Sequence, residues 1–251
     1  GMTFTGCDNI LDSTPAVTIS EDLFWQTEDD AEKAIIGVYG PLMDEYYFAG
    51  HTEPVWDVQS DDLYRAGDWG DDAQLETFNA NPEQGELFGR GWKLKFEGIK
   101  RANDVLRNVP SMSISEQKKN EILGQAYFMR AYNYFHLVEQ FGDVTLTTTY
   151  NASPSTSAER HDMVRVYEEV IIPDLLNAIR LCSPSPQLNN LESGRASAAT
   201  ARHLLSRVYL TLAWVFDKDP ANPSYKGNTQ TKYYNTTKAC LLYTSDAADE
   251  L

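Results

Sequence analysis

Apolar residues recur along much of the chain at the helical spacing of about 3.6 residues. This spacing predicts helices over residues 29–43, 88–108, 162–181 and 197–216. Another helix, predicted to run to about residue 140, is expected to start at a capping box formed by Ser113 and Glu116. A sixth is expected to begin near Thr231. Helices of this length joined by turns predict paired antiparallel hairpins and a mostly α fold.

The segments between these helices differ in composition. Residues 46–86 are rich in Asp, Gly and Trp and show no clear period, so we expect a long loop with room only for short strands. Residues 151–160 read as a Ser/Pro/Thr linker. Pro173 falls inside the predicted helix 162–181, where it indicates a kink or a fresh helix start.

Two of the predicted helices contain a weak internal sequence repeat. The run from Arg130 to Phe135 resembles the run from Arg207 to Leu212, and each is late in the second helix of a predicted pair. Small residues such as Ala126 would allow the helices to approach closely. The pattern is typical of stacked, tetratricopeptide-like hairpins whose repeat has become irregular.

Charge and hydropathy exclude several functional classes. The 251 residues carry a formal net charge of −16, and 42% of them are hydrophobic. No run approaches the roughly 20 apolar residues that span a bilayer. The acid excess would repel nucleic acid, so no nucleic-acid partner is expected.

Both ends of the chain have unusual features. Gly1 precedes Met2, and the residues from 240 to 251 resemble the translation of a transposase adapter used in sequencing libraries. Cys7 follows two small residues, as in a lipoprotein processing site, although Phe4 stands where a branched aliphatic residue is usual and the apolar leader is missing. We therefore expect a lipoprotein-like segment over 1–28, a helical portion over 29–239 and an adapter-derived tail over 240–251.

A candidate ligand site lies in the loop over residues 59–72. Trp69 is flanked by glycine, and Asp61, Asp62 and Arg65 provide hydrogen-bonding groups close to it in sequence. Aromatic rings stack on the C–H faces of sugars, while carboxylates and Arg bind the hydroxyl edges. The alternative is a solvated acidic loop with Trp69 packed against the scaffold. The Asp residues lack the spacing of a calcium-binding EF-hand loop.

Other reactive residues form no catalytic or metal pattern. The four histidines are scattered without zinc-ligand spacing, and no GxSxG motif occurs, so neither a metal nor a cofactor is expected. Arg130 and Arg207 are set in apolar helices and are expected to be structural ties to acids or carbonyls. Five aromatic residues on helical faces are expected in the core: Trp92, Phe96, Tyr132, Tyr134 and Phe135.

Several segments together resemble the SusD/RagB family of outer-membrane nutrient-binding lipoproteins. They are Cys7-x3-Leu11-Asp12-x2-Pro15, Gly37-Val38-Tyr39, Trp92-x3-Phe96-x2-Ile99-x2-Ala102-Asn103, Gly124-Gln125-Ala126-x2-Met129-Arg130-Ala131-Tyr132-x-Tyr134-Phe135, Phe141-Gly142-Asp143-Val144 and Gly194-Arg195-Ala196. Gln125 departs from the family pattern, in which an acid is common, and Thr145 stands where proline is usual. Family members are considerably longer, so the resemblance implies an N-terminal portion truncated at its C-terminus.

The resemblance also implies a function. A member of this family is expected to be a surface-exposed lipoprotein of the outer membrane, anchored by lipid on Cys7. It would capture oligosaccharide or polysaccharide for a TonB-dependent, SusC-like transporter, without cleaving the glycan. Uptake of peptides or glycoproteins by the same kind of system is a close alternative. A glycoside hydrolase, which needs two carboxyl groups across a cleft, and a plain helical adaptor also remain open.

Overall fold

The computed structural model describes residues 24–47, 60, 86–148, 159–184 and 194–217. Within them the α-helices are α2 (Glu28–Tyr39), α5 (Glu86–Asn108), α6 (Glu116–Phe141), α7 (Met163–Val166), α8 (Ile172–Leu181) and α9 (Ala198–Asp217). Short 3₁₀ turns, Gly40–Met43 and Val109–Ser111, follow α2 and α5. The mostly α prediction is confirmed. The helix expected near Thr231 and nearly all of the loop expected over 46–86 lie outside the described residues.

The start of α2 follows directly from its sequence. The Thr27 hydroxyl accepts a hydrogen bond from the Asp30 backbone N–H, and the Asp30 carboxylate accepts one from the Thr27 N–H. Two of the backbone donors left open at a helix start are thereby satisfied. The pKa of Asp30 is lowered below its usual value because the Asp30 carboxylate accepts hydrogen bonds from the Thr27 hydroxyl and from the Thr27 N–H.

The predicted cap of the next hairpin was wrong by two residues. The N-cap of α6 is Ser115, whose hydroxyl accepts from the Lys118 N–H, and not Ser113. The segment between α5 and α6 first makes the 3₁₀ turn Val109–Ser111, then bends over residues 112–114, and reaches the helix through Ser115 in extended conformation. The capping-box pattern favoured Ser113 because Glu116 stands three residues after it, but the helix begins only after Ser115.

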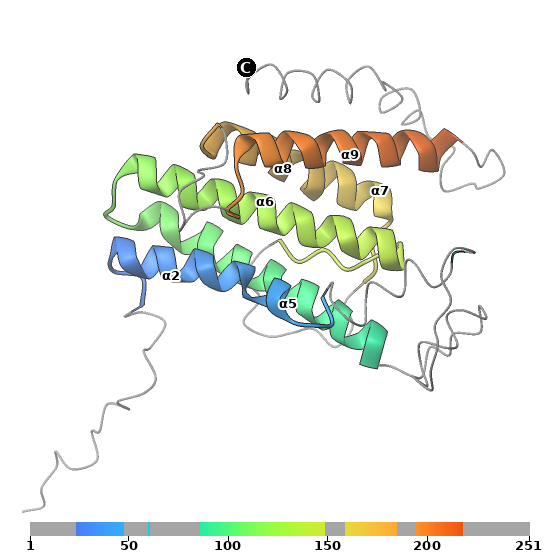
Figure 1. Cartoon of the computed structure of the whole chain (residues 1–251), viewed down its shortest axis with the longest axis horizontal. Helices are drawn as coiled ribbons and strands as arrows, with labels where there is room; N and C mark the ends of the chain where they lie inside the picture. Colours follow the sequence, from blue (N-terminus) through green and yellow to red (C-terminus); the bar gives the residue numbers. More distant parts are fainter. Residues whose placement is uncertain (1–23, 48–59, 61–85, 149–158, 185–193, 218–251) are drawn as a thin grey trace, which may run out of the picture.

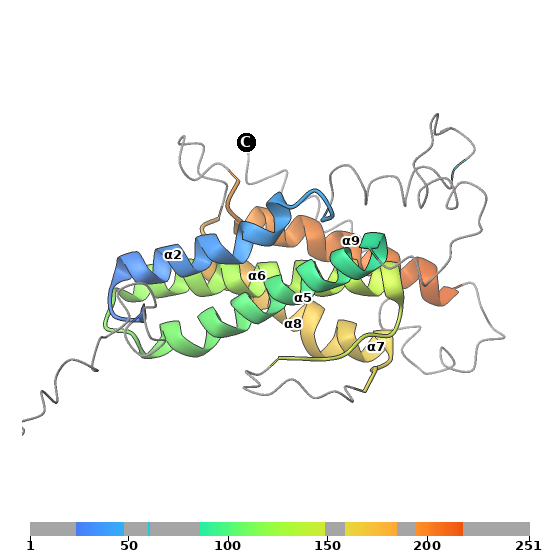
Figure 2. The ribbon, with the colours of Figure 1, turned by 90° about the horizontal axis from the view of Figure 1, so that it is seen from below.

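Helix α6 is the central element of the fold. Figure 2 shows it between α2 and α9 on one side and α5 and α8 on the other. It is buried on nearly all sides over its second half, which is the expected state of a helix without a polar face. It ends at Gly142, whose positive φ of 67° is the left-handed region that glycine adopts without strain.

Consecutive helices pair as antiparallel hairpins. Helices α5 and α6 form one pair and α8 and α9 the next (Figure 1). This is the stacked arrangement that the sequence predicted. Outside the helices, the described residues contain one isolated antiparallel bridge, Val144 with His161, which joins the end of α6 to the start of α7.

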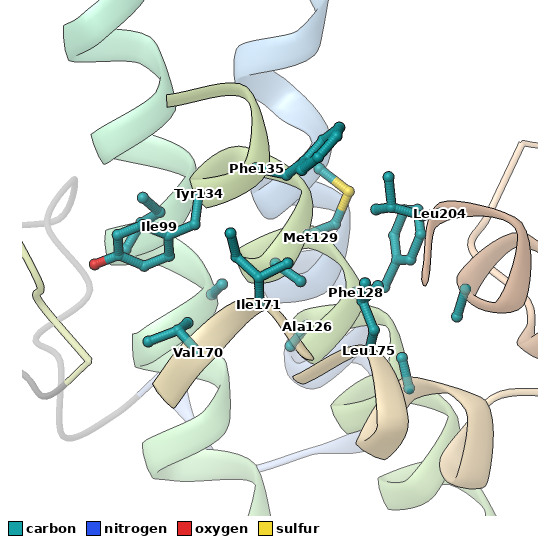
Figure 3. Packing of buried hydrophobic residues seen from close by; sticks show 14 of the residues in the cluster. Ile99, Ala126, Phe128, Met129, Tyr134, Phe135, Val170, Ile171, Leu175 and Leu204 are labelled. Carbon is teal, nitrogen blue, oxygen red and sulfur yellow. The ribbon is translucent and has the colours of Figure 1, made fainter. Parts of the chain in front are cut away.

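One hydrophobic core runs through the stack (Figure 3). Phe135 of α6 is fully buried, and its ring lies edge-to-face against Tyr167 at 6.3 Å between centroids. Leu175 of α8 and Leu205 of α9 extend the same cluster. Burying a side chain of this size contributes about 1.5–3 kcal/mol, so the stack is held chiefly by apolar packing.

The irregular helix before α8 has a local cause. Pro173 lacks an N–H and its ring would clash with the carbonyl of Glu169, so a regular α-helix cannot pass through this position. The chain instead widens into a π-helical turn over Tyr167–Ile171 and resumes as α8. The expected helix start near Pro173 is thus confirmed. α8 begins at Ile172, directly after the π-helical turn and without an intervening loop. No helix among the described residues is long and apolar enough to cross a membrane.

Candidate functional site

The residues predicted to bind ligand lie outside the part of the chain that the structure describes. This applies to Asp61, Asp62, Arg65 and Trp69, and also to Cys7. Their roles stay predictions. The segment 48–85 contains the four loop residues. The structure does describe the residues that flank the two ends of this segment, up to Tyr47 and from Glu86 on.

Five residues hold these ends together, and we call them the root cluster: Asp44, Tyr46, Tyr47, Arg90 and Lys95. The Arg90 guanidinium lies over the Tyr46 ring at 3.8 Å from its centroid, and its nitrogen is 3.7 Å from an Asp44 carboxylate oxygen. The Lys95 ammonium lies 4.7 Å from the centroid of the Tyr47 ring. Residues from before and after the segment are therefore in direct contact.

The root cluster is fastened to α6 through a buried amide. The Tyr47 hydroxyl donates to Asn133 Oδ1 at 2.7 Å, and Asn133 Nδ2 donates to the Met129 carbonyl at 2.7 Å. Both side chains are buried, so each bond replaces lost water contacts. Burial also raises the pKa of Tyr47 well above its ordinary value, which keeps the hydroxyl protonated as a donor.

Lys95 is a buried cation. Its side chain has no exposed surface, and its ammonium donates to the Gly91 carbonyl at the long distance of 3.5 Å. Burial lowers its pKa to about 8. The sequence carried a signal for this residue, because Lys95 shares a helical face with the buried Ile99 and Ala102. Sequence reasoning did not use it.

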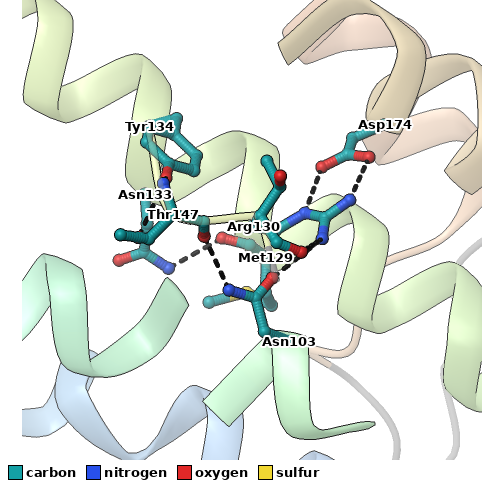
Figure 4. A network of polar contacts seen from close by, with 8 residues as sticks. Asn103, Met129, Arg130, Asn133, Tyr134, Thr147 and Asp174 are labelled. Carbon is teal, nitrogen blue, oxygen red and sulfur yellow. Dashed lines mark hydrogen bonds and ion pairs between the residues drawn. The ribbon is translucent and has the colours of Figure 1, made fainter. Parts of the chain in front are cut away.

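A second polar network ties α5, α6 and α8 together (Figure 4). The Arg130 guanidinium makes two bonds to the Asp174 carboxylate, at 2.7 and 2.8 Å, and a third to Asn103 Oδ1 at 2.8 Å. Asn103 in turn donates to the Thr147 carbonyl. Burial raises the pKa of Asp174, and the bonds from Arg130 offset part of that rise. Arg130 is therefore the structural tie that the sequence predicted.

The chain that follows α6 is held by residues of α5 and α6. Tyr134 receives a hydrogen bond on its hydroxyl oxygen from the Thr147 N–H at 2.7 Å. With the Asn103 contact, this fixes Thr147 in the stretch that leads into the segment 149–158. Both networks therefore hold the bases of connecting segments.

The remaining aromatic and titratable candidates are part of the packing. Tyr134 and Phe135 are buried, whereas Trp92, Phe96 and Tyr132 pack against the core and are partly exposed. Arg207 is half exposed and reaches across to Glu139 of α6 at 3.5 Å. Burial lowers the pKa of His136 to about 3, so this imidazole is neutral at physiological pH. Among the described residues, no group of His, Cys, Asp and Glu could hold a metal ion.

Comparison with known proteins identifies the family of this helical chain. Residues 27–210 match the model of a SusD-like family described as "starch-binding associating with outer membrane". The chain belongs to this family. A SusD-like protein of Formosa agariphila, P2, is 29% identical over 215 residues, which are 84% of this chain and 41% of that protein. The chain thus spans about two fifths of the length of the SusD-like relative it matches.

Solved SusD-like structures share the fold. A laminarin-binding SusD-like protein is 26% identical, with a TM-score of 0.67 over 75% of this chain and 41% of the other. Surface glycan-binding protein A from Bacteroides fluxus is 25% identical, with a TM-score of 0.64 over 76% of this chain and 42% of the other. A SusD-like protein from Bacteroides fragilis, 19% identical, aligns over 89% of this chain and 39% of its own with a TM-score of 0.66 and supports the fold alone.

Proposed function

We propose that this chain is the helical frame of a surface-exposed lipoprotein that binds oligosaccharides for import and does not cleave them. The family match over residues 27–210 carries the proposal. It is supported by two similar structures whose names state laminarin binding and surface glycan binding. In this function the stacked helices supply rigidity, and the loops supply the groups that contact sugar.

The sugar contacts are proposed for the segment 48–85. Trp69 would stack on a pyranose face, and Asp61, Asp62 and Arg65 would bind its hydroxyl groups. The root cluster supports this assignment because it joins both ends of the segment to α5 and α6. A binding loop on a rigid scaffold loses less entropy when ligand binds than a loop with free ends.

Glycan affinity is the first test. Isothermal titration of the chain against laminarin, starch and a panel of other polysaccharides should show binding to at least one of them. Trp69→Ala should weaken that binding by roughly tenfold or more, the cost of removing an aromatic anchor. Trp56→Ala, in the same segment but outside residues 59–72, is the matched control and should keep most of the affinity. Equal losses in both variants would contradict the role of Trp69.

A second test concerns the membrane assembly. We propose that lipid on Cys7 anchors the protein and that a TonB-dependent, SusC-like transporter is its partner. Affinity purification of the tagged protein from outer membranes should recover a large β-barrel transporter. Cys7→Ala should move the protein to the soluble fraction, because the acyl chains supply the membrane affinity. Retention of the variant in the membrane without the transporter would refute the anchor.

Titrations and a reducing-end assay on the same protein distinguish two alternative functions. A peptide-binding member of this system would bind peptides in the titrations and none of the polysaccharides. A glycoside hydrolase would release reducing ends from the polysaccharide it binds, through two carboxyl groups roughly 5–10 Å apart.

A further inference from the structure

Arg130 and Arg207 hold corresponding positions in the weak internal sequence repeat, but they use their guanidinium groups differently. Arg130 on α6 makes two hydrogen bonds to the Asp174 carboxylate, at 2.7 and 2.8 Å, and its side chain is only 11% exposed. The Arg207 side chain on α9 is 56% exposed, and its two hydrogen bonds to Glu139 come from one nitrogen and are 3.5 Å long. Charged groups normally pair at about 2.7–2.9 Å, so Arg207 is held loosely.

The Glu139 carboxylate on α6 is also weakly engaged. Its side chain is 15% exposed, and burial raises its pKa, an effect that Arg207 opposes only in part. Another contact in the described part of the chain is His136 Nδ1, at 3.5 Å. Because burial lowers the pKa of His136 to about 3, that imidazole is neutral and supplies no counter-charge. The carboxylate therefore keeps capacity to accept shorter hydrogen bonds from a ligand.

An aromatic side chain lies beside this pair. Tyr132 precedes Glu139 by two turns of α6, is partly exposed, and packs edge-to-face on His136 at 4.6 Å between centroids. Burial is the main cause that raises the pKa of the Tyr132 hydroxyl, and the charges of Arg207 and Glu139 act on it in opposite directions. The hydroxyl therefore lies near both groups. An aromatic ring, a carboxylate and a guanidinium thus gather where α9 reaches across to α6.

The chemistry of this group selects a neutral ligand rich in hydroxyls. An anion would be repelled by Glu139, and a cation would be repelled by Arg207. A carboxylate only accepts hydrogen bonds and a guanidinium only donates them, whereas a hydroxyl does both. Neighbouring hydroxyl groups of one sugar can therefore satisfy two charged groups that lie 3.5 Å apart, while the sugar's C–H face contacts an aromatic ring.

We propose that Tyr132, Glu139 and Arg207 form a sugar-binding contact on the helical frame itself. Glu139 accepts a hydrogen bond from one hydroxyl of a pyranose, Arg207 donates to the oxygen of the next, and the exposed part of Tyr132 packs on the ring. This inference rests on the proposed function, because it names a place where the same class of ligand is held. It does not depend on the loop residues, since all three side chains belong to the described parts of α6 and α9.

Isothermal titration of the full chain tests this contact, with laminarin, soluble starch and the other polysaccharides of the panel as probes. Glu139→Gln keeps the shape of the side chain and removes its charge. Arg207→Met keeps much of the aliphatic stem and removes every N–H donor of the guanidinium. With each polysaccharide that binds the wild type, either variant should raise the Kd about fivefold or more, as loss of a hydrogen bond to a charged group would.

The matched controls are Arg165→Met and Glu169→Gln. These residues form another Arg–Glu pair, with both side chains 52% exposed, so the control variants change the net charge equally at a different place. They should bind each polysaccharide as the wild type does. The melting temperatures of Glu139→Gln and Arg207→Met should stay within about 3 °C of the wild type, because a long ion pair with a half-exposed partner contributes little stability. A purely structural pair would not weaken binding at unchanged stability.

A second measurement needs no variant and keeps the test valid if one of them fails to fold. Phenylglyoxal modifies exposed arginine side chains, and mass spectrometry of the wild type gives the rate at each site. A saturating polysaccharide should slow modification of Arg207 about fivefold or more, because the sugar covers the guanidinium. Modification of Arg165, which is equally accessible, should be unchanged.

The outcomes separate this contact from the proposed function. A wild-type Kd in either folded site variant, or equal modification of Arg207 with and without bound polysaccharide, would overturn the contact and leave glycan binding by the protein intact. Absence of binding of every polysaccharide to the wild type would overturn the contact together with the proposed function.

Discussion

Replacing Arg130 by Met is expected to lower the free energy of unfolding by about 3–5 kcal/mol, because it leaves a buried carboxylate without its partner. Asp174 is buried on α8, and Arg130 supplies two hydrogen bonds to it. Met keeps much of the aliphatic volume of the arginine. The loss of stability is therefore caused mainly by the broken charge pair and only to a small extent by a cavity. Urea unfolding followed by circular dichroism measures it.

The pair can be dissected with two further variants. Asp174→Asn leaves the Arg130 guanidinium without its counter-charge and should also destabilise strongly. The double replacement of Arg130 by Met and Asp174 by Leu removes both charges together. It should recover much of the loss, because apolar pairs can replace buried ion pairs at little cost. A double variant as unstable as the sum of the single ones would show that the two residues act independently.

The loss of unfolding free energy in Arg130→Met should also depend on pH. Burial raises the pKa of Asp174, and removing Arg130 removes the interaction that opposes this rise. When the pKa of a carboxyl group is higher in the folded state than in the unfolded state, ionising that group destabilises the fold. The free energy of unfolding therefore falls as the pH rises from about 4, the unfolded-state pKa, through the folded-state pKa. The variant should therefore approach wild-type stability near pH 4 and fall furthest below it near pH 7. A deficit that is constant between these values would contradict this cause.

The helices could be read from the sequence because each buries an apolar face that recurs at helical spacing. Thr27 and Gly142 mark real helix ends for reasons that are local to a few residues. The cap of α6 was misplaced because Glu116, three residues after Ser113, completes a capping-box pattern there, whereas the actual cap, Ser115, has Lys118 at that spacing. Pro173 indicated a break, and the π-helical turn is the form that the break takes.

The polar networks depended on contacts that no local pattern contains. Tyr47 and Asn133 are 86 residues apart, and only the fold brings the residues after the 3₁₀ turn Gly40–Met43 close to α6. Arg130 could be expected to have a partner, but its identity as Asp174 required the fold. The candidate loop residues were chosen by their chemistry alone. Their assignment therefore rests on the proposed titrations, whereas the helices belong to the described part of the chain.

Replacing Gly124 by Ala is expected to destabilise the protein by about 2 kcal/mol, although alanine is the better helix former. In the middle of a helix the change from Gly to Ala ordinarily contributes about 1 kcal/mol of stability. At this position the added Cβ would lie 2.7 Å from Cys182 Sγ and 2.8 Å from the Cys182 backbone nitrogen. Overpacking costs about 1–3 kcal/mol, and the upper part of this range applies where backbone must move.

Gly37 provides the matched control, because a Cβ there would meet nothing within 4 Å. Gly37→Ala should therefore gain about 0.5–1 kcal/mol, opposite in sign to Gly124→Ala. Adding Cys182→Ala to Gly124→Ala removes the sulfur contact but leaves the backbone nitrogen in place, so only part of the loss should return. Denaturant midpoints of the four proteins measure these differences. A stabilised Gly124→Ala would show that α6 and the end of α8 are less closely packed than their contact implies, since this glycine is what lets the two helices approach.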